Sequence, residues 1–139
     1  METRALATDA VILLDGQVVL MERNHEPHEG SWVLPGGLVE PHERAHEACS
    51  RETREEVGLS VAPITFVGLY DGPDRDVRGN VSAAFLCRPT EPGQTPNARE
   101  EARRVETFDP TDLPPMGFDH ERIVEDATTL DRRGANEQF

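Results

Sequence analysis

One helical stretch, residues 42–57, carries glutamates on the same side as its few apolar residues. Its composition is rich in Glu, Arg and Ala, and Gly58 follows as a residue typical of a helix C-terminus. At about 100° per residue, Glu52 and Glu56 fall within the apolar stripe, and Glu55 falls on its edge. Because a helix normally turns its apolar stripe towards the core, the chain is expected to fold with three carboxylates lying against a sheet.

Carboxylates placed in this way need compensation. Like charges repel one another and are costly to remove from water unless a cation joins them. The pair Gly36-Gly37 precedes the helix and predicts a tight bend that aims a backbone carbonyl at the same place. Ligation by oxygen alone suits Mg²⁺ or Mn²⁺, so the pattern predicts a divalent metal site. The alternative interpretation is a solvated acidic helix that binds no ion.

The remaining elements predict a fold of the α/β class. Asp15-Gly16 joins the first two apolar runs as a hairpin turn. An amphipathic helix is expected at residues 119–130, and the tail from Asp131 is expected to fray. These elements indicate one domain, residues 1–139, with strands and helices in layers. The strands are expected at residues 7–14, 17–23, 31–34, 61–70, 81–87 and 101–108.

The charge balance narrows the possible partners. The chain has 27 acidic residues and 14 basic ones, all of them Arg, for a net charge of −13. Such a surface repels phosphate backbones, so no nucleic-acid partner is expected. No apolar run approaches the roughly 20 residues that cross a bilayer, and two cysteines make no disulfide framework, so a cytoplasmic protein without a membrane partner is expected. The acid excess without Lys predicts a halophilic protein adapted to high salt; a GC-rich genome that encodes Arg in place of Lys is the alternative.

Around the acidic helix, charged residues, two glycines and a leucine stand at fixed spacing. They are Gly37, Glu43, Arg51, Glu52, Glu55, Glu56, Gly58 and Leu59. Over residues 37–59 this pattern resembles the signature of the Nudix hydrolases, and the flanking strands extend the resemblance over most of the chain. The resemblance implies an α/β/α sandwich with a mixed β-sheet, which hydrolyses a nucleoside diphosphate linked to another moiety with the help of Mg²⁺ or Mn²⁺. Two residues depart from the pattern: Thr53 replaces an aliphatic residue, with an expected loss of packing, and His42 replaces a common glycine.

The resemblance also implies a role for each matching position. Glu52 and Glu56 correspond to the principal metal ligands, and Glu55 to a third ligand or to the residue that positions water. The carbonyl of Gly36 corresponds to a backbone ligand. With Arg51, the three glutamates form the expected catalytic set.

Further positions of the pattern correspond to structural residues. Arg51 is expected to pair with Glu43, and Gly37 and Gly58 are expected to shape the chain on either side of the helix. The attacking water must also lose a proton. Glu52 or Glu55 could accept it, or a glutamate from a later loop, as in many relatives. The candidates outside the pattern are Glu91, Glu100, Glu101 and Glu106.

Residues 68–80 carry the signal for the substrate. A run of Pro, Gly and Asp by itself predicts only a rigid turn. The string that begins at Pro73 nevertheless resembles the ADP-ribose pyrophosphatases within the family, which implies Pro73, Arg75 and Arg78 as substrate contacts. ADP-ribose would then give AMP and ribose 5-phosphate. The sparse aromatic residues Trp32, Tyr70 and Phe118 either stack on a base or belong to the core.

Two other functions stay open at this stage. The first is a pyrophosphohydrolase for oxidised or excess nucleoside triphosphates. The second is a nonhydrolytic nucleotide sensor with the same fold, against which the intact set of Glu52, Glu55 and Glu56 argues. A small-molecule nucleotide is the expected partner in each case, and the resemblance implies a homodimer, since many relatives are homodimers.

Overall fold

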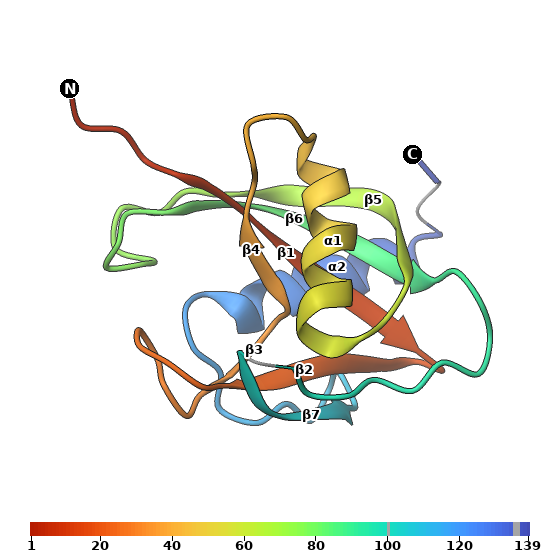
Figure 1. Ribbon diagram of the computed structural model, residues 1–139. Coiled ribbons are helices and arrows are strands. Elements are labelled where there is room, and N and C mark those ends of the chain that lie inside the picture. Colours follow the sequence, from red (N-terminus) through yellow and green to blue (C-terminus); the bar gives the residue numbers. More distant parts are fainter. Residues whose placement is uncertain (100, 135–136) are drawn as a thin grey trace.

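The computed structural model describes residues 1–99, 101–134 and 137–139 and contains a mixed sheet between two helices (Figure 1). The strands are β1 (Leu6–Leu14), β2 (Gln17–Arg23), β3 (Trp32–Val33), β4 (Gly36–Leu38), β5 (Val61–Tyr70), β6 (Val81–Pro89) and β7 (Ala102–Phe108). The helices are α1 (Ala45–Val57) and α2 (His120–Arg132). Within the described ranges, neither helix is long and apolar enough to cross a membrane. The α/β class is confirmed.

The sheet has the order β3-β2-β1-β6-β5, with β4 paired to β1 and β7 paired to β2. β1 runs parallel to β6 and antiparallel to β2 and β4, so the expected mixed sheet is confirmed. The hairpin turn between β1 and β2 is also where it was predicted, since Asp15 and Gly16 both have positive φ.

The apolar run of β1 is continuous because both faces of the sheet are covered. Ala10 and Ile12 belong to the cluster on the α1 side, whereas Val11 and Leu13 belong to the cluster on the α2 side. Figure 1 shows α1 in front of the sheet and α2 behind it. A strand buried on both faces needs apolar residues at every position, which explains the absence of alternation.

The Gly36-Gly37 pair lies in a strand, so the expected sharp bend is wrong. Gly36 pairs with Asp9 of β1 and Gly37 pairs with Thr8. A Cβ on Gly36 would collide with the Thr8 carbonyl, and one on Gly37 would collide with the Glu52 carboxylate. Because the two glycines have no side chains, β4 can lie directly against β1 and α1.

α1 begins later than the composition predicts, at Ala45 and not at His42. Arg44 has the extended backbone of an N-cap residue, and its N–H donates to Glu47 Oε1 at 2.7 Å. Residues 41–44 form a turn and a short connection in place of a first helical turn. The helix ends as predicted, with Gly58 in the left-handed conformation.

The C-terminal tail is docked where the structure describes it, so the expected fraying is wrong there. α2 continues to Arg132. The Gln138 N–H donates to the Ile64 carbonyl at 2.7 Å, and the Phe66 N–H donates to Gln138 Oε1 at 2.9 Å. The ring of Phe139 stacks on His46 of α1. One backbone hydrogen bond and one bond to the Gln138 side chain join these last residues to the edge of β5.

Thr53 offers a test of how α1 packs. Its side chain is fully buried, so packing is intact, but no partner for its hydroxyl lies among the described residues. A buried hydroxyl without a partner costs about 1–3 kcal/mol. We expect Thr53→Val, which keeps the shape, to raise the free energy of unfolding by about 1 kcal/mol in urea melts.

The matched control is Thr128→Val on α2. The hydroxyl of Thr128 donates to the Val124 carbonyl at 3.0 Å, so its removal should give no gain. A Thr53→Val protein less stable than the wild type would mean that the hydroxyl is satisfied in solution.

Candidate active site

A cavity of about 320 Å³ opens beside β4 and the start of α2. Carboxylates line it from β1, α1, the β5–β6 loop and the start of β7: Asp9, Glu52, Asp76 and Glu101. Guanidinium groups line it from β2 and the β5–β6 loop: Arg23, Arg75 and Arg78. Gly36 and Gly37 form part of the wall as well. Groups of both signs therefore meet in one cavity of a strongly acidic chain.

Two carboxylates on the acidic side have poorly compensated charge: Glu52 lines the cavity, whereas Glu56 does not line it and lies against Gly36 of the wall. Glu56 is only 3% exposed, and its Oε1 accepts the Gly36 N–H at 2.8 Å. Burial raises the pKa of Glu56 well above its usual value, and the neighbouring charge of Glu52 raises it further. Burial also raises the pKa of Glu52, against the opposing effect of Arg51. The inward placement predicted for these two glutamates is what the structure shows.

Arg51 holds the carboxylates of this helix in place. Its Nε donates to Glu43 Oε2 at 3.0 Å, and its Nη1 donates to Glu52 Oε1 at 2.8 Å and to Glu55 Oε2 at 3.2 Å. These bonds to Glu43 lower the pKa of that carboxyl to about 2. The expected pairing of Arg51 with Glu43 is present. Arg51 itself is not among the residues that line the cavity.

Glu55 differs from the other two glutamates. Its side chain is 55% exposed, and it does not line the cavity. The structure therefore brings together Glu52, Glu56 and the Gly36 backbone, with Glu55 at the margin, held by Arg51. The difference arises because Glu55 lies on the edge of the inward stripe.

The donor set fits a divalent cation. It consists of oxygen atoms only, and two buried carboxylates that repel one another are stabilised when a cation joins them. Across residues 1–99, 101–134 and 137–139, no three His, Cys, Asp or Glu side chains are gathered closely enough to hold a metal among themselves. Any further ligands would therefore come from backbone, water or substrate oxygens, as is usual for Mg²⁺.

The basic side of the cavity centres on Phe118. The Cζ atom of Arg23 lies 5.3 Å from the centre of this ring, and that of Arg78 lies 5.9 Å from it. Burial and the nearby charge of Arg78 lower the pKa of Arg23, although a guanidinium remains charged in proteins. Two cations so close together favour a bound anion. The sequence interpretation did not single out Arg23; its one signal is a charge that ends the apolar strand β2.

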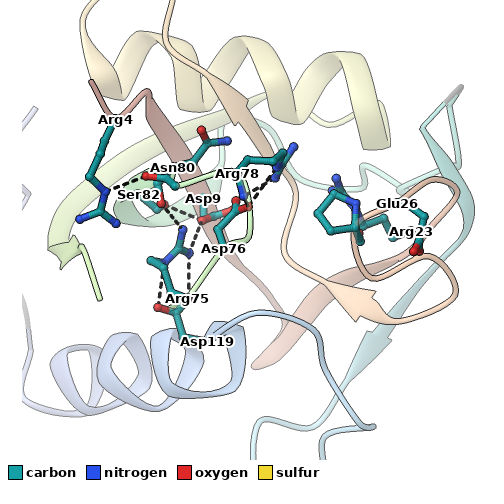
Figure 2. A network of polar contacts seen from close by, with 12 residues as sticks. Arg4, Asp9, Arg23, Glu26, Arg75, Asp76, Arg78, Asn80, Ser82 and Asp119 are labelled. Atoms are coloured by element: carbon teal, nitrogen blue, oxygen red, sulfur yellow. Dashed lines mark hydrogen bonds and ion pairs between the residues drawn. The ribbon is translucent and has the colours of Figure 1, made fainter. Parts of the chain in front are cut away.

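The three expected substrate residues occupy different places. Arg75 is almost fully buried, and its Nε and Nη2 donate to Asp119 at 2.9 and 2.8 Å (Figure 2). Its Nη1 donates to the Asn80 carbonyl at 3.1 Å. Arg75 thus anchors the loop to α2, and it also lines the cavity. Pro73 does not line the cavity, whereas Arg78 lines it and is 45% exposed.

Of the three aromatic candidates, one lines the cavity and two pack against the core. Phe118 lines the cavity. Trp32 packs edge-on against Phe108 with a centroid distance of 5.0 Å, and the Tyr70 hydroxyl donates to Asp126 at 2.6 Å. Trp32 and Tyr70 thus belong to the packing around α2, as their alternative interpretation predicted.

One of the glutamates outside the signature lines the cavity in the structure. Glu101 lines it, with its Oε2 3.6 Å from His25 Nε2. On β7, Glu106 Oε1 lies 3.8 Å from Arg104 Nη1. Glu91 lies in the turn after β6. Glu100 lies outside the described residues.

A buried pair that the sequence interpretation missed forms the floor of the cavity. The Leu34 N–H donates to His120 Nδ1 at 2.9 Å, and the Nε2 of that ring lies 3.4 Å from Asp9 Oδ2. Ser82 also donates to Asp9. Burial alone would raise the pKa of Asp9, but His120 and Ser82 hold it below its usual value. These four residues are far apart in the chain, so no local pattern could predict their contact.

Comparisons with known proteins agree with this geometry. The NUDIX domain model matches residues 3–127. The ADP-ribose pyrophosphatase of Methanocaldococcus jannaschii is 38% identical over 122 residues, which cover 88% of this chain and 72% of the relative. A MutT/nudix family protein from Enterococcus faecalis superposes with a TM-score of 0.83 at 25% identity, over 95% of this chain and 64% of that one. An ADP-ribose pyrophosphatase from Streptococcus suis superposes with a TM-score of 0.75 at 25% identity. The match covers 99% of this chain and 96% of that one.

Glu56→Gln tests the metal site by stability. The substitution keeps the acceptor for the Gly36 N–H and removes a buried charge, so the melting temperature in chelator should equal or exceed that of the wild type. A bound ion stabilises the wild type by RT ln(1 + [L]/Kd), and the variant should gain less from millimolar Mg²⁺. Melts with chelator and with Mg²⁺ measure both quantities.

Glu125→Gln on the exposed side of α2 is the control and should show the wild-type gain with Mg²⁺. A Glu56→Gln protein that is less stable in chelator and gains the full increment would return Glu56 to the solvated-helix interpretation.

Proposed function

Because this chain belongs to the Nudix family of pyrophosphohydrolases, we propose that its substrate is ADP-ribose or a closely related nucleoside diphosphate sugar. The products would be AMP and ribose 5-phosphate. The observation that carries the proposal is a cavity lined by the Glu52 carboxylate and by the guanidinium groups of Arg23 and Arg78, with the buried Glu56 carboxylate bonded to Gly36 of the cavity wall. The carboxylates of such a site would bind the metal ion, and the guanidinium groups would bind the negatively charged diphosphate.

Glu52, Glu56 and the carbonyl of Gly36 would hold Mg²⁺, for which Mn²⁺ could substitute, and Glu55, held at the margin by Arg51, would orient water. When bound, the ion offsets the charge on the nonbridging oxygens of the diphosphate and acidifies water. The residues of the chain contribute by fixing the position of the Glu52 carboxylate. Arg51 fixes the Glu52 carboxylate, and the absence of a side chain at Gly37 leaves that carboxylate its room.

Arg23 and Arg78 would bind the diphosphate itself. A chain with a net charge of −13 repels an anionic substrate, so local cations must overcome that field at the point of binding. The nearby charge of Arg78 contributes to the lowered pKa of Arg23, and a bound phosphate would offset the repulsion between the two guanidinium groups. Phe118 between them gives the nucleoside or ribose end an apolar surface.

Glu101 would accept the proton of the attacking water. It lines the cavity, whereas Glu91 and Glu106 do not. Its carboxylate lies close enough to His25 for an ion pair when the imidazole is protonated, which would orient it. Water attack at phosphorus would then break the bond to the bridging oxygen, and the phosphate of the other product would leave.

We also retain as proposals a cytoplasmic location, a homodimer and adaptation to high salt. The last of these is supported by the charge of −13 and by the absence of Lys, because salt screens repulsion between surface acids.

The products give the first test of the reaction. With Mg²⁺, ADP-ribose should yield AMP and ribose 5-phosphate in equal amounts, and phosphate should be released only after a phosphatase is added. Nucleoside triphosphates should be turned over with a lower kcat/KM. Glu56→Gln should lower turnover by at least about 10²-fold, because charge stabilisation in the transition state is lost. Chromatography of the reaction measures the products; ADP or inorganic phosphate as a primary product would refute the mechanism.

The proton acceptor is tested by Glu101→Gln. General-base catalysis contributes about 10²–10⁴-fold, so kcat should fall by that amount with little change in KM. Glu106→Gln on β7 is the matched control. Glu106 does not line the cavity, so this change should keep kcat within about twofold. If Glu101→Gln retains wild-type kcat, the acceptor lies within the signature, at Glu52 or Glu55.

A further inference from the structure

The side chain of Arg4, two residues before β1, reaches across the loop between β5 and β6. Its Nε donates to the Gly79 carbonyl at 2.7 Å, its Nη1 to the Asp71 carbonyl at 2.8 Å and its Nη2 to the Gly72 carbonyl at 3.2 Å. Residues 71–79, which we call the clasped loop, are thus joined at both ends by one guanidinium group. Figure 2 shows Arg4 on the side of the loop away from Arg23.

The contacts inside the clasped loop connect this clasp to Arg78. The buried Asp76 carboxylate accepts the Arg78 N–H at 2.8 Å and the Arg78 Nε at 3.0 Å. The Gly79 N–H donates to the Asp76 carbonyl at 2.9 Å. Since Gly79 directly follows Arg78 and has a positive φ, a fixed Gly79 carbonyl also fixes the backbone from which Arg78 extends.

Arg4 and Arg75 hold the clasped loop from opposite sides, but they differ in exposure. Arg75 is almost fully buried against Asp119, so its removal would leave a carboxylate without its partner. The hydrogen bonds of Arg4 are exposed and go to backbone carbonyls. Arg4 can therefore be replaced without burying an unpaired charge.

We propose that Arg4 is a positioning residue for substrate binding, which closes the clasped loop and so holds Arg78 at the cavity wall where the diphosphate binds. This inference rests on the proposed function. Without the guanidinium group, the carbonyls of Asp71, Gly72 and Gly79 would be left to water. The pairing of Tyr70 with Ser82 would still join the strands, but Arg4 would no longer tie Gly79 to the start of the loop. A lysine has no planar fork and cannot span three carbonyls in the same way.

A double-mutant cycle on Arg4 and Arg78 tests the proposal, with KM and kcat for ADP-ribose as readouts. Arg4→Ala should raise KM by about fivefold to tenfold and keep kcat within about twofold, and Arg4→Lys should behave like Arg4→Ala. Arg78→Ala should raise KM at least as much. Because Arg4 acts through Arg78, the double variant should have the KM of Arg78→Ala alone.

The control is Arg88→Ala on β6, another exposed arginine, which pairs with Asp131 away from the cavity. It should leave KM unchanged. A wild-type KM in Arg4→Ala or in Arg4→Lys would overturn the proposal, and so would losses that multiply in the double variant. If Arg78→Ala itself leaves KM unchanged, the proposed binding of the diphosphate by Arg78 is wrong, and that result is distinct from a failure at Arg4 alone.

Discussion

The hydrogen bond from the Gly36 N–H to the buried Glu56 carboxylate joins the helix α1 to the sheet. It requires β4 to lie so close to β1 and α1 that neither Gly36 nor Gly37 has room for a Cβ. The same close approach buries Glu56 and half-buries Glu52, and it leaves their charges without full compensation. The favourable place for a cation is thus a consequence of how the helix packs, and Arg51 holds the carboxylates of Glu52 and Glu55 in position.

The opposite wall solves the second electrostatic problem, which is how an acidic chain attracts an anionic substrate. Arg23 comes from the end of β2, and Arg78 comes from the clasped loop; both approach Phe118 at the start of α2. All three arginines line the cavity and have partners within the chain, but Arg78 keeps 45% of its side chain exposed beside Asp76, whereas Arg75 is buried against Asp119. Concentrating cations at one place allows binding without changing the overall charge of the surface.

Local patterns predicted the parts of the molecule that depend on local geometry. The helical period alone placed Glu52 and Glu56 on the inward face of α1, and Asp15-Gly16 marked the first hairpin. The errors arose where a residue type serves two purposes or where the partner is distant. Glycines permit a bend or a close approach, and the sequence does not distinguish them. Arg75 is buried against Asp119, which is 44 residues away, whereas Arg78 pairs with Asp76 two residues before it. The docked tail depends on the edge of β5.

The assignment of the two walls is tested most directly by a crystal structure with Mn²⁺ and α,β-methylene ADP-ribose, a substrate analogue that resists hydrolysis. The anomalous signal of manganese should lie between the carboxylates of Glu52 and Glu56, beside the Gly36 carbonyl, and the diphosphate should extend from it to Arg23 and Arg78. A manganese signal away from these glutamates, or a diphosphate bound outside the cavity, would contradict the assignment.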